Sequence, residues 1–176
     1  ALSWPDADIK EEEWLEKWAH AFDVEKVTKQ FYQDYRTIFD RSEILISEKN
    51  QTKNVEKNDL RMFTQILFNR LMFLRFVERK GWLEFQDRND YLLALKQSGP
   101  LNNSSFYKSR LWPLFFEGLA ISGKQSSDIY GSVPFLNGGL FEITDLDRRF
   151  EHVPDEVFED ILSEEGLFYR YNFTVE

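Results

Sequence analysis

The longest run of bulky apolar side chains in this sequence lies between Asp59 and Gly81, DLRMFTQILFNRLMFLRFVERKG. Apolar residues occupy most of the circumference of a helix drawn through this run, with arginines set among them. A helix of this kind must be covered by neighbours on several sides. The pattern predicts a buried central helix at about 59–80, with Asn58 or Asp59 as its N-cap and Gly81 just past its end.

Two helical patterns precede this segment. Residues 8–20 form a short amphipathic pattern, and residues 24–48 form a longer one, for which Asp23 is the expected N-cap. The polar, turn-prone residues 49–58 predict a loop before the central helix.

Shorter elements follow the central helix. Residues 88–97 predict a short helix, and another helix is expected to begin after residues 103–105. Pro113 lies inside this second helix and should kink or split it, because proline removes a backbone donor and crowds the preceding turn.

The last third of the chain changes character. In residues 129–143, Asn137-Gly138-Gly139 lies between apolar pairs and predicts a tight turn, which favours a small hairpin. Residues 154–165 predict a helix that ends at Gly166. Residues 167–175 alternate enough to predict a strand, or the entry to a following domain.

These patterns together predict a mainly α fold, a multi-helix bundle around one buried central helix, with a minor β hairpin or strand near the C-terminal end. The expected domains are a lead-in with a short helix at 1–22, a helical domain at 23–166 and the start of a link at 167–176. The chain begins with Ala1 and ends inside a Phe/Tyr-rich segment, so we expect it to be a fragment of a longer protein.

Composition supports a real core and excludes several classes of site. The 176 residues are 42% hydrophobic and 16% aromatic, and none is cysteine. Disulfides and thiolate metal sites are therefore excluded. The two histidines, His20 and His152, are expected in surface or capping roles. No apolar run reaches membrane-spanning length and no signal peptide is visible, so we expect a cytoplasmic protein.

The net charge of −9 argues against a free-standing nucleic-acid binder. Residues 60–124 nevertheless carry ten basic and five acidic side chains, whereas both flanks are acidic. Only this middle block could follow a phosphate backbone. The candidates for contact with the DNA backbone are Arg70, Arg75, Arg79, Lys80, Lys108 and Arg110.

A structural role for these cations is favoured over contact with the DNA backbone. They could pair with acids such as Glu78 and Glu117 and cover apolar surface with their aliphatic stems. The tryptophans Trp14, Trp18, Trp82 and Trp112 are likewise expected to pack between helices rather than to stack on bases.

No catalytic motif is present. The chain lacks a phosphate-binding loop, GxGxxG, HExxH and GxSxG. Acids are plentiful at Asp145, Asp147 and along 155–160, but the Glu-x-Lys that a metal-dependent nuclease would need does not follow them. The favoured interpretation is an acidic, solvated helix face. We therefore predict no catalytic, cofactor-binding or metal-binding residue in this chain.

Several stretches nevertheless resemble one family. In their order and spacing they are similar to the helical region upstream of the methyltransferase domain in type IIG restriction-modification enzymes and related phage-defence adenine-specific DNA methyltransferases. The resemblance covers roughly residues 24–176. The stretches are LFNRLMFLRFVERKGWL (67–83), FYKSRLWPLFFEGLA (106–120), VPFLNGGLFE (133–142) and LFYRYNFTVE (167–176).

The resemblance implies a parent in which a helical connector joins an N-terminal nuclease domain to an N6-adenine methyltransferase that uses S-adenosylmethionine. A C-terminal region of such a parent reads the DNA. The Asn-Pro-Pro-Tyr-type motif and the glycine-rich cofactor loop of the methyltransferase do not occur here. S-adenosylmethionine, and Mg²⁺ where the parent cleaves DNA, would therefore belong to the parent. The implied partners are DNA, through the parent, and the nuclease and methyltransferase domains of the same chain.

The leading hypothesis is thus a non-catalytic helical connector that positions these modules on DNA. One alternative is a self-standing DNA-binding module that uses the basic block at 60–124, and another is a metal-dependent nuclease fragment that uses acids in 142–160. A third is a protein–protein adaptor with exposed apolar residues near 129–143. Under the leading hypothesis Phe73 and Leu74 lie in the core, and a charge at either should unfold the domain.

Overall fold

The computed structural model describes residues 11–50, 56–136 and 138–171, with side chains from residue 26 onward. The chain divides into two compact units, Ala1–Arg36 and Thr37–Glu176. The first unit contains the N-terminal part of helix α1, and the second contains everything from Thr37 onward. The domain boundaries expected from the sequence, at 22 and 166, remain predictions.

Helix α1 runs without a break from Glu11 to Lys49. The expected division into two helices, with Asp23 as a cap, is therefore wrong. No glycine or proline interrupts this stretch, and a single aspartate inside a helix costs too little to end it. Within the first unit, the Phe31 and Tyr35 rings lie one turn apart and tilted to each other, with their centroids at 6.1 Å. The side chains of Trp14, Trp18 and His20 lie outside the described residues.

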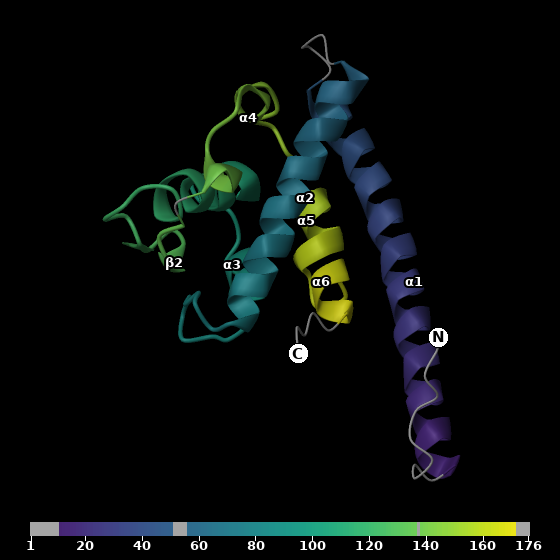
Figure 1. The fold of residues 1–176 in the computed structure, drawn as a ribbon. Helices are drawn as coiled ribbons and strands as arrows, with labels where there is room; N and C mark the ends of the chain where they lie inside the picture. Colours follow the sequence, from purple (N-terminus) through teal and green to yellow (C-terminus); the bar gives the residue numbers. More distant parts are fainter. Residues whose placement is uncertain (1–10, 51–55, 137, 172–176) are drawn as a thin grey trace. The chain divides into compact units, whose positions relative to one another are not determined.

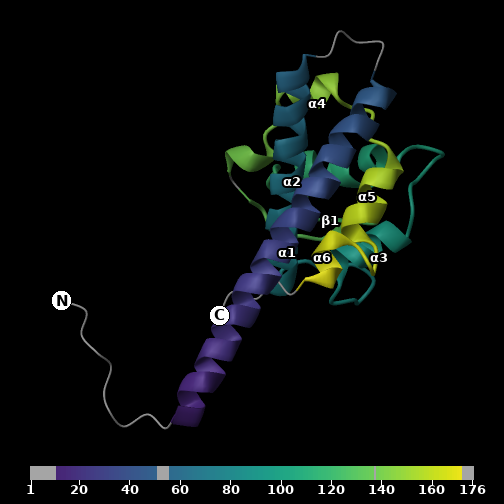
Figure 2. The ribbon, with the colours of Figure 1, turned by 90° about the vertical axis from the view of Figure 1, so that its right-hand side faces the viewer.

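Helix α2 (Lys57–Arg79) is the centre of the second unit. Figures 1 and 2 show the part of α1 after Arg36 running beside it, and the Phe39 and Phe68 rings meet there at 5.2 Å. Helices α3 (Tyr91–Gln97) and α4 (Asp145–Arg149) also contact α2. The apolar side chains that α2 buries come from one broad face, and they are Leu60, Phe63, Leu67, Phe68, Leu71, Leu74 and Val77.

The rest of the α2 surface faces solvent. Met62 is 57% exposed, and Phe73 and Phe76 are each 36% exposed. The expectation that Phe73 lies in the core is therefore wrong, whereas Leu74 is fully buried. The sequence pattern missed this because apolar residues occur on both the covered and the uncovered face.

The sequence predicted the C-terminal end of α2 correctly but not its N-terminal end. The N-cap residue is Glu56, without a capping side chain, so the expected cap at Asn58 or Asp59 is wrong. The expected stop at Gly81 is confirmed. Gly81 has φ +71°, its N–H donates to Glu78 O at 2.9 Å, and Trp82 N–H donates to Val77 O at 3.3 Å. This pair of bonds closes a Schellman motif, which favours glycine at the left-handed position.

The helix around Pro113 consists of two π-helical segments, η1 (Tyr107–Leu111) and η2 (Leu114–Gly118). The proline joins them with helical dihedral angles, φ −65° and ψ −34°. Wider π turns adapt the backbone pattern to a residue without an N–H. The expected split at Pro113 thus takes the form of two π-helical segments within one continuous helical stretch.

The small sheet lies earlier in the chain than the sequence suggested. Strands β1 (Ser126–Ser127) and β2 (Gly131–Ser132) pair antiparallel, and Glu84 forms a bridge with Ser132. Gly131 has φ +74°, and a Cβ there would collide with the Glu84 carbonyl. The expected hairpin at 137–139 is not observed in the described residues, because Gly139–Phe141 forms a 3₁₀ turn, η3, and Asn137 lies outside them.

Helices α5 (Asp155–Leu162) and α6 (Leu167–Arg170) complete the second unit. The expected inward side of α5 is confirmed, since Val157, Phe158, Ile161 and Leu162 are all fully buried. The strand expected from residue 167 is wrong for residues 167–170, which form α6. Leu167 and Phe168 are both fully buried, a pattern that a helical turn permits and a strand with one covered face does not. Residues 172–176 lie outside the described residues.

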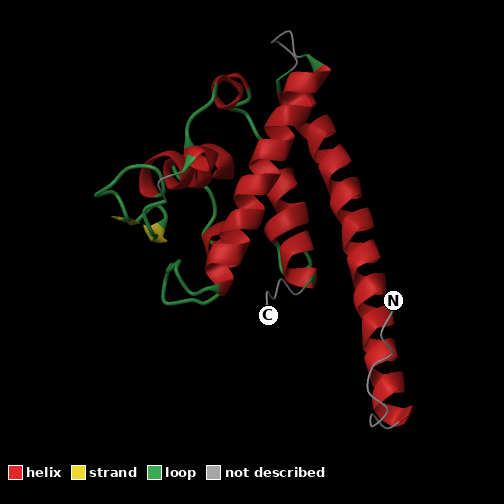
Figure 3. Cartoon of the chain, in the orientation of Figure 1, coloured by secondary structure: helices red, strands yellow, loops and turns green. Residues whose placement is uncertain are grey.

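The fold is mainly helical with one small two-stranded antiparallel sheet, which confirms the predicted fold class (Figure 3). Among the described residues, no helix combines the length and the apolar character that crossing a membrane requires.

The neighbouring residues Leu74 and Phe73 provide a matched test of the core. Leu74→Asp should abolish cooperative unfolding, because a charge would be buried without a partner at a cost of several kcal/mol. Phe73→Asp should cost only about 1–2 kcal/mol, because its carboxylate can reach water. Thermal unfolding followed by circular dichroism compares the two variants, and equal losses would contradict the assigned faces.

Candidate functional site

The six cations predicted to contact DNA fall into two groups. Arg70, Arg75 and Arg110 are 1%, 7% and 5% exposed, respectively, whereas Arg79, Lys80 and Lys108 face solvent. The structure does not bring the six into one surface. The buried three instead bind groups within the fold.

Arg70 holds α2 to the segment that carries η3 and α4. Its guanidinium binds both carboxylate oxygens of Asp147, at 2.6 and 3.1 Å, and donates to Leu140 O at 2.7 Å and Glu142 O at 3.1 Å. It also lies over the Phe116 ring, 4.9 Å from the centroid. Two buried charges are stable only when paired and hydrogen-bonded in this way.

Asp147 also caps the N-terminus of α4. Its Oδ2 accepts hydrogen bonds from the backbone N–H and the hydroxyl of Thr144, each at 2.8 Å, and the Thr144 hydroxyl accepts from Asp147 N–H at 3.3 Å. This reciprocal pair is a capping box that begins α4. One carboxylate therefore both starts a helix and neutralises the buried arginine.

Tyr107 lies near this ion pair. Its hydroxyl is buried and has no hydrogen-bond partner among the described residues. Burial, and secondarily the negative charge of Asp147, raises the pKa of Tyr107 above its ordinary value, and Arg70 opposes the shift. The phenol therefore stays protonated at neutral pH and is no candidate for a general base.

A second buried network joins α2, α3 and α6. Arg75 pairs with Glu78 and donates to Phe168 O at 3.1 Å. Glu78 also accepts from Leu92 N–H at 2.6 Å and from the Tyr169 hydroxyl at 3.1 Å. Burial raises the pKa of Glu78 above its ordinary value, although these donors and the Arg75 charge act in the opposite direction.

Arg110 is a third buried arginine that binds backbone carbonyls, here beside the small sheet. It donates to Gly99 O at 3.0 Å and Ile129 O at 2.7 Å. Burial lowers the pKa of Arg110 below its ordinary value. The nearby Tyr91 hydroxyl donates to Tyr130 O at 2.6 Å, so the loop that carries the strands is held from two sides.

The exposed cations differ in their surroundings. Lys108 pairs with Glu151 at 3.1 Å and lies over the Trp112 ring, 4.2 Å from the centroid. Lys80 lies over the Phe76 ring without an ion pair in the described part of the chain. Contact of these cations with DNA remains a prediction. Trp82 is 58% exposed, which contradicts the expected packing role.

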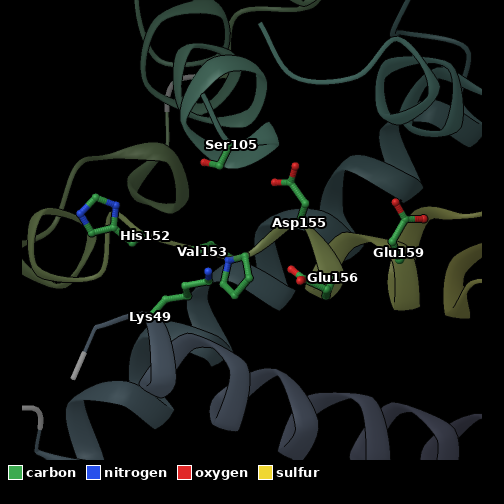
Figure 4. Close-up of a pocket in the computed structure, with 8 residues that line it drawn as sticks. Lys49, Ser105, His152, Val153, Asp155, Glu156 and Glu159 are labelled. Carbon is green, nitrogen blue, oxygen red and sulfur yellow. The ribbon is translucent and has the colours of Figure 1, made fainter. Parts of the chain in front are cut away.

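A surface pocket of about 510 Å³ gathers residue types that can form a catalytic triad (Figure 4). Ser105, His152 and Asp155 all line it. However, Ser105 Oγ accepts from Lys108 N–H at 3.2 Å, and Asp155 Oδ1 accepts from Phe106 N–H at 2.8 Å. No hydrogen bond joins the three side chains to one another in the described part of the chain. The serine and the aspartate cap the helix that begins at Phe106.

The acids at 142–160 do not form a metal site among the described residues, where no group of three or more potential ligands converges. Asp147 is bound to Arg70, Asp155 caps a helix, and Asp160 pairs with Arg41 at 3.0 Å. These carboxylates are engaged in structural contacts.

Sequence reasoning named Glu78 as a partner for these cations without assigning it to Arg75, and it missed the partners of Arg70. Glu117, the other acid expected to pair, is exposed and has no ion pair in the described region. The Thr144-x-x-Asp147 spacing is a capping-box signal that could have located Asp147. Nothing in the sequence pattern could have indicated that Arg70 binds it from 77 positions away.

Comparison with known proteins gives one finding on ancestry. The chain is 26% identical, over an alignment 184 positions long, to RM.MjaORFECS2P of Methanocaldococcus jannaschii, provisionally named a type II restriction enzyme and methyltransferase. The match covers 86% of this chain but only 15% of that protein. It establishes distant homology to a small part of a restriction-modification enzyme. No protein-family profile matches the chain, and no solved structure matches it.

Removing one partner of the Arg70–Asp147 pair should be costly. Asp147→Ala should destabilise the chain by about 3–5 kcal/mol, because a buried guanidinium would lose its counter-charge. The double variant Arg70→Met/Asp147→Leu should recover much of this loss. Urea unfolding measures both, with Asp145→Ala as the exposed control. A loss for Asp147→Ala no larger than that for Asp145→Ala would contradict the role of the pair.

Glu78 should give the chain a distinctive pH dependence. Because its pKa is raised in the folded state above 4.5, the folded chain holds this proton more tightly than the unfolded chain does. The stability from this group is present below pH 4.5 and is lost as pH rises through the raised pKa. The unfolding free energy of the natural chain, minus that of Glu78→Gln, should therefore fall as the pH rises above 4.5. A difference that stays constant or rises would refute the assignment.

Proposed function

We propose that this chain is a non-catalytic helical connector domain of a restriction-modification enzyme, and that it holds catalytic modules in a fixed relation. The observation that carries the proposal is the homology to RM.MjaORFECS2P, which extends over 86% of the chain. The chain spans about a seventh of that relative, 15% of its length, so the activities in the relative's name concern a much larger polypeptide.

The internal chemistry of the chain supports a mechanical role. Its buried charged groups bind one another and backbone carbonyls, and they tie α2 and η1 to other segments of the chain. Networks that satisfy every buried charge rigidify a fold. A spacer between two modules needs such rigidity, whereas a catalytic site needs polar groups directed at a substrate.

The finer assignment follows the sequence resemblance. We propose a parent of the type IIG class or a related phage-defence adenine methyltransferase. In this parent the connector joins a nuclease to an S-adenosylmethionine-dependent N6-adenine methyltransferase acting on DNA. Mg²⁺ would serve the nuclease if the parent cleaves DNA. The connector role does not require that this chain touch DNA directly.

The other hypotheses have less support. A DNA-binding module would need its cations on the surface, but Arg70, Arg75 and Arg110 are buried. A nuclease would need free carboxylates, but Asp147 and Asp155 are already bound within the fold. An adaptor role has one supporting observation, since Phe135 and Ile143 are 43% and 40% exposed.

The proposal predicts a division of activity between the chain and its parent. The 176-residue chain should neither cleave plasmid DNA with Mg²⁺ or Mn²⁺ nor transfer methyl groups from labelled S-adenosylmethionine. The full-length polypeptide should methylate adenine, and its reading frame should contain an Asn-Pro-Pro-Tyr-type motif outside this chain. Metal-dependent cleavage by the isolated chain, lost in Asp155→Ala, would favour the nuclease hypothesis instead.

A further inference from the structure

An exposed apolar surface lies beside the Arg70 network. It consists of Phe73 and Phe76 on α2 and of Ile143, which follows two residues after the Phe141 ring that Phe73 meets, and we call it the Phe73 surface. The Phe73 and Phe76 rings lie 6.5 Å apart on the uncovered face of α2, and Phe73 meets the buried Phe141 ring of η3 at 6.0 Å. Ile143 is 40% exposed. Exposed apolar groups gathered at one place on a domain are characteristic of protein contact sites.

The buried ion pair keeps this surface in one conformation. Arg70 binds the carbonyls of Leu140 and Glu142 and the carboxylate of Asp147, so the segment that carries Ile143 is fixed on both sides. In this position the segment contacts Phe73 through Phe141 and leaves Phe73 36% exposed. A surface held in its binding conformation loses less conformational entropy when a partner docks.

The charges around the Phe73 surface are arranged by sign. Arg79 and Lys80 lie three and four residues after Phe76, so they flank its ring on the helix surface. Within the part of the chain that the structure describes, Arg79 has no hydrogen bond, ion pair or ring contact, whereas every other arginine with a described side chain has a partner. On either side of Ile143, Glu142 is exposed, and Asp145 is exposed and pairs with Arg148 at 3.1 Å.

This arrangement favours a protein over DNA. An apolar centre with a charged rim is the usual anatomy of a protein interface. A phosphate backbone attracted by Arg79 and Lys80 would be repelled by the carboxylate of Glu142 beside Ile143. A protein partner with carboxylates at one edge can pair with Arg79 without this cost.

The partner most accessible to this surface is part of the same polypeptide. The match covers only 15% of the homologous enzyme, and this inference rests on the proposed function, in which the remaining modules are covalently joined to the chain. Covalent linkage gives such a module a high effective concentration. We propose that the Phe73 surface docks another folded domain of the same polypeptide, one that presents an apolar face with carboxylates opposite Arg79 and Lys80.

The absence of cysteine from the chain permits a direct test by thiol labelling. Ile143→Cys and Phe76→Cys place single thiols on the Phe73 surface. Ile44→Cys places a control thiol on α1, at a residue that is 60% exposed. Each variant is labelled with a maleimide, in the 176-residue chain and in the full-length polypeptide, and the rate at that position is read by mass spectrometry.

Docking should slow labelling of both test thiols by at least about tenfold in the full-length polypeptide, which corresponds to about 1.4 kcal/mol. The Ile44→Cys thiol should react equally fast in both forms. Adding Arg79→Glu to the full-length Ile143→Cys variant should restore fast labelling, whereas the matched change Lys124→Glu, in a distant loop, should leave the protection intact.

Three results would overturn the inference. The first is equal labelling of the test thiols in both forms, the second is protection in the isolated chain that grows with its concentration and so indicates a second copy, and the third is protection that requires added duplex DNA. Methyl transfer by the same full-length preparation is measured in parallel. Failure of the proposed function then shows as lost methylation, and failure of docking shows as unprotected thiols.

Discussion

The second unit depends on the buried pair between Arg70 and Asp147. The pair joins the middle of the central helix to a segment more than seventy positions later, and the same guanidinium holds the carbonyls of Leu140 and Glu142. Taking two charges out of water is expensive, and only complete hydrogen bonding offsets the cost. The segment from η3 to α4 is consequently restricted to one position against α2, which exposes some apolar side chains and buries others.

The same principle recurs in the Arg75–Glu78 and Arg110 networks. In each, an arginine from a helix satisfies acceptors contributed by other segments, such as Phe168 O and Ile129 O. Polar residue types that could serve catalysis, including Ser105 and Asp155, cap helix ends instead. These polar and charged side chains therefore bind groups within the fold. This fits a domain that fixes geometry for the larger restriction-modification polypeptides to which the chain is distantly homologous.

The periodic apolar pattern predicted much of this fold but little of the candidate site. It located α2, the stop at Gly81 and the buried side of α5, because local spacing and glycine chemistry decide those features. It placed a false boundary at Asp23 and a false strand at Leu167, where local signals were weak and packing decided. Among the six candidate cations, spacing could not separate buried Arg70 from exposed Arg79, since both lie on one helix and each has an apolar residue three positions before it.

The sequence alone determined that the chain is mainly helical, that it has a substantial core and that no established catalytic motif is present. These properties follow from composition and from short-range periodicity. Tertiary structure decided which face of α2 is covered, which arginines lose contact with water and which aromatic side chains remain exposed. The physical reason is that burial and charge pairing depend on residues far apart in the chain, as Arg70 and Asp147 are, and a local pattern carries no record of such partners.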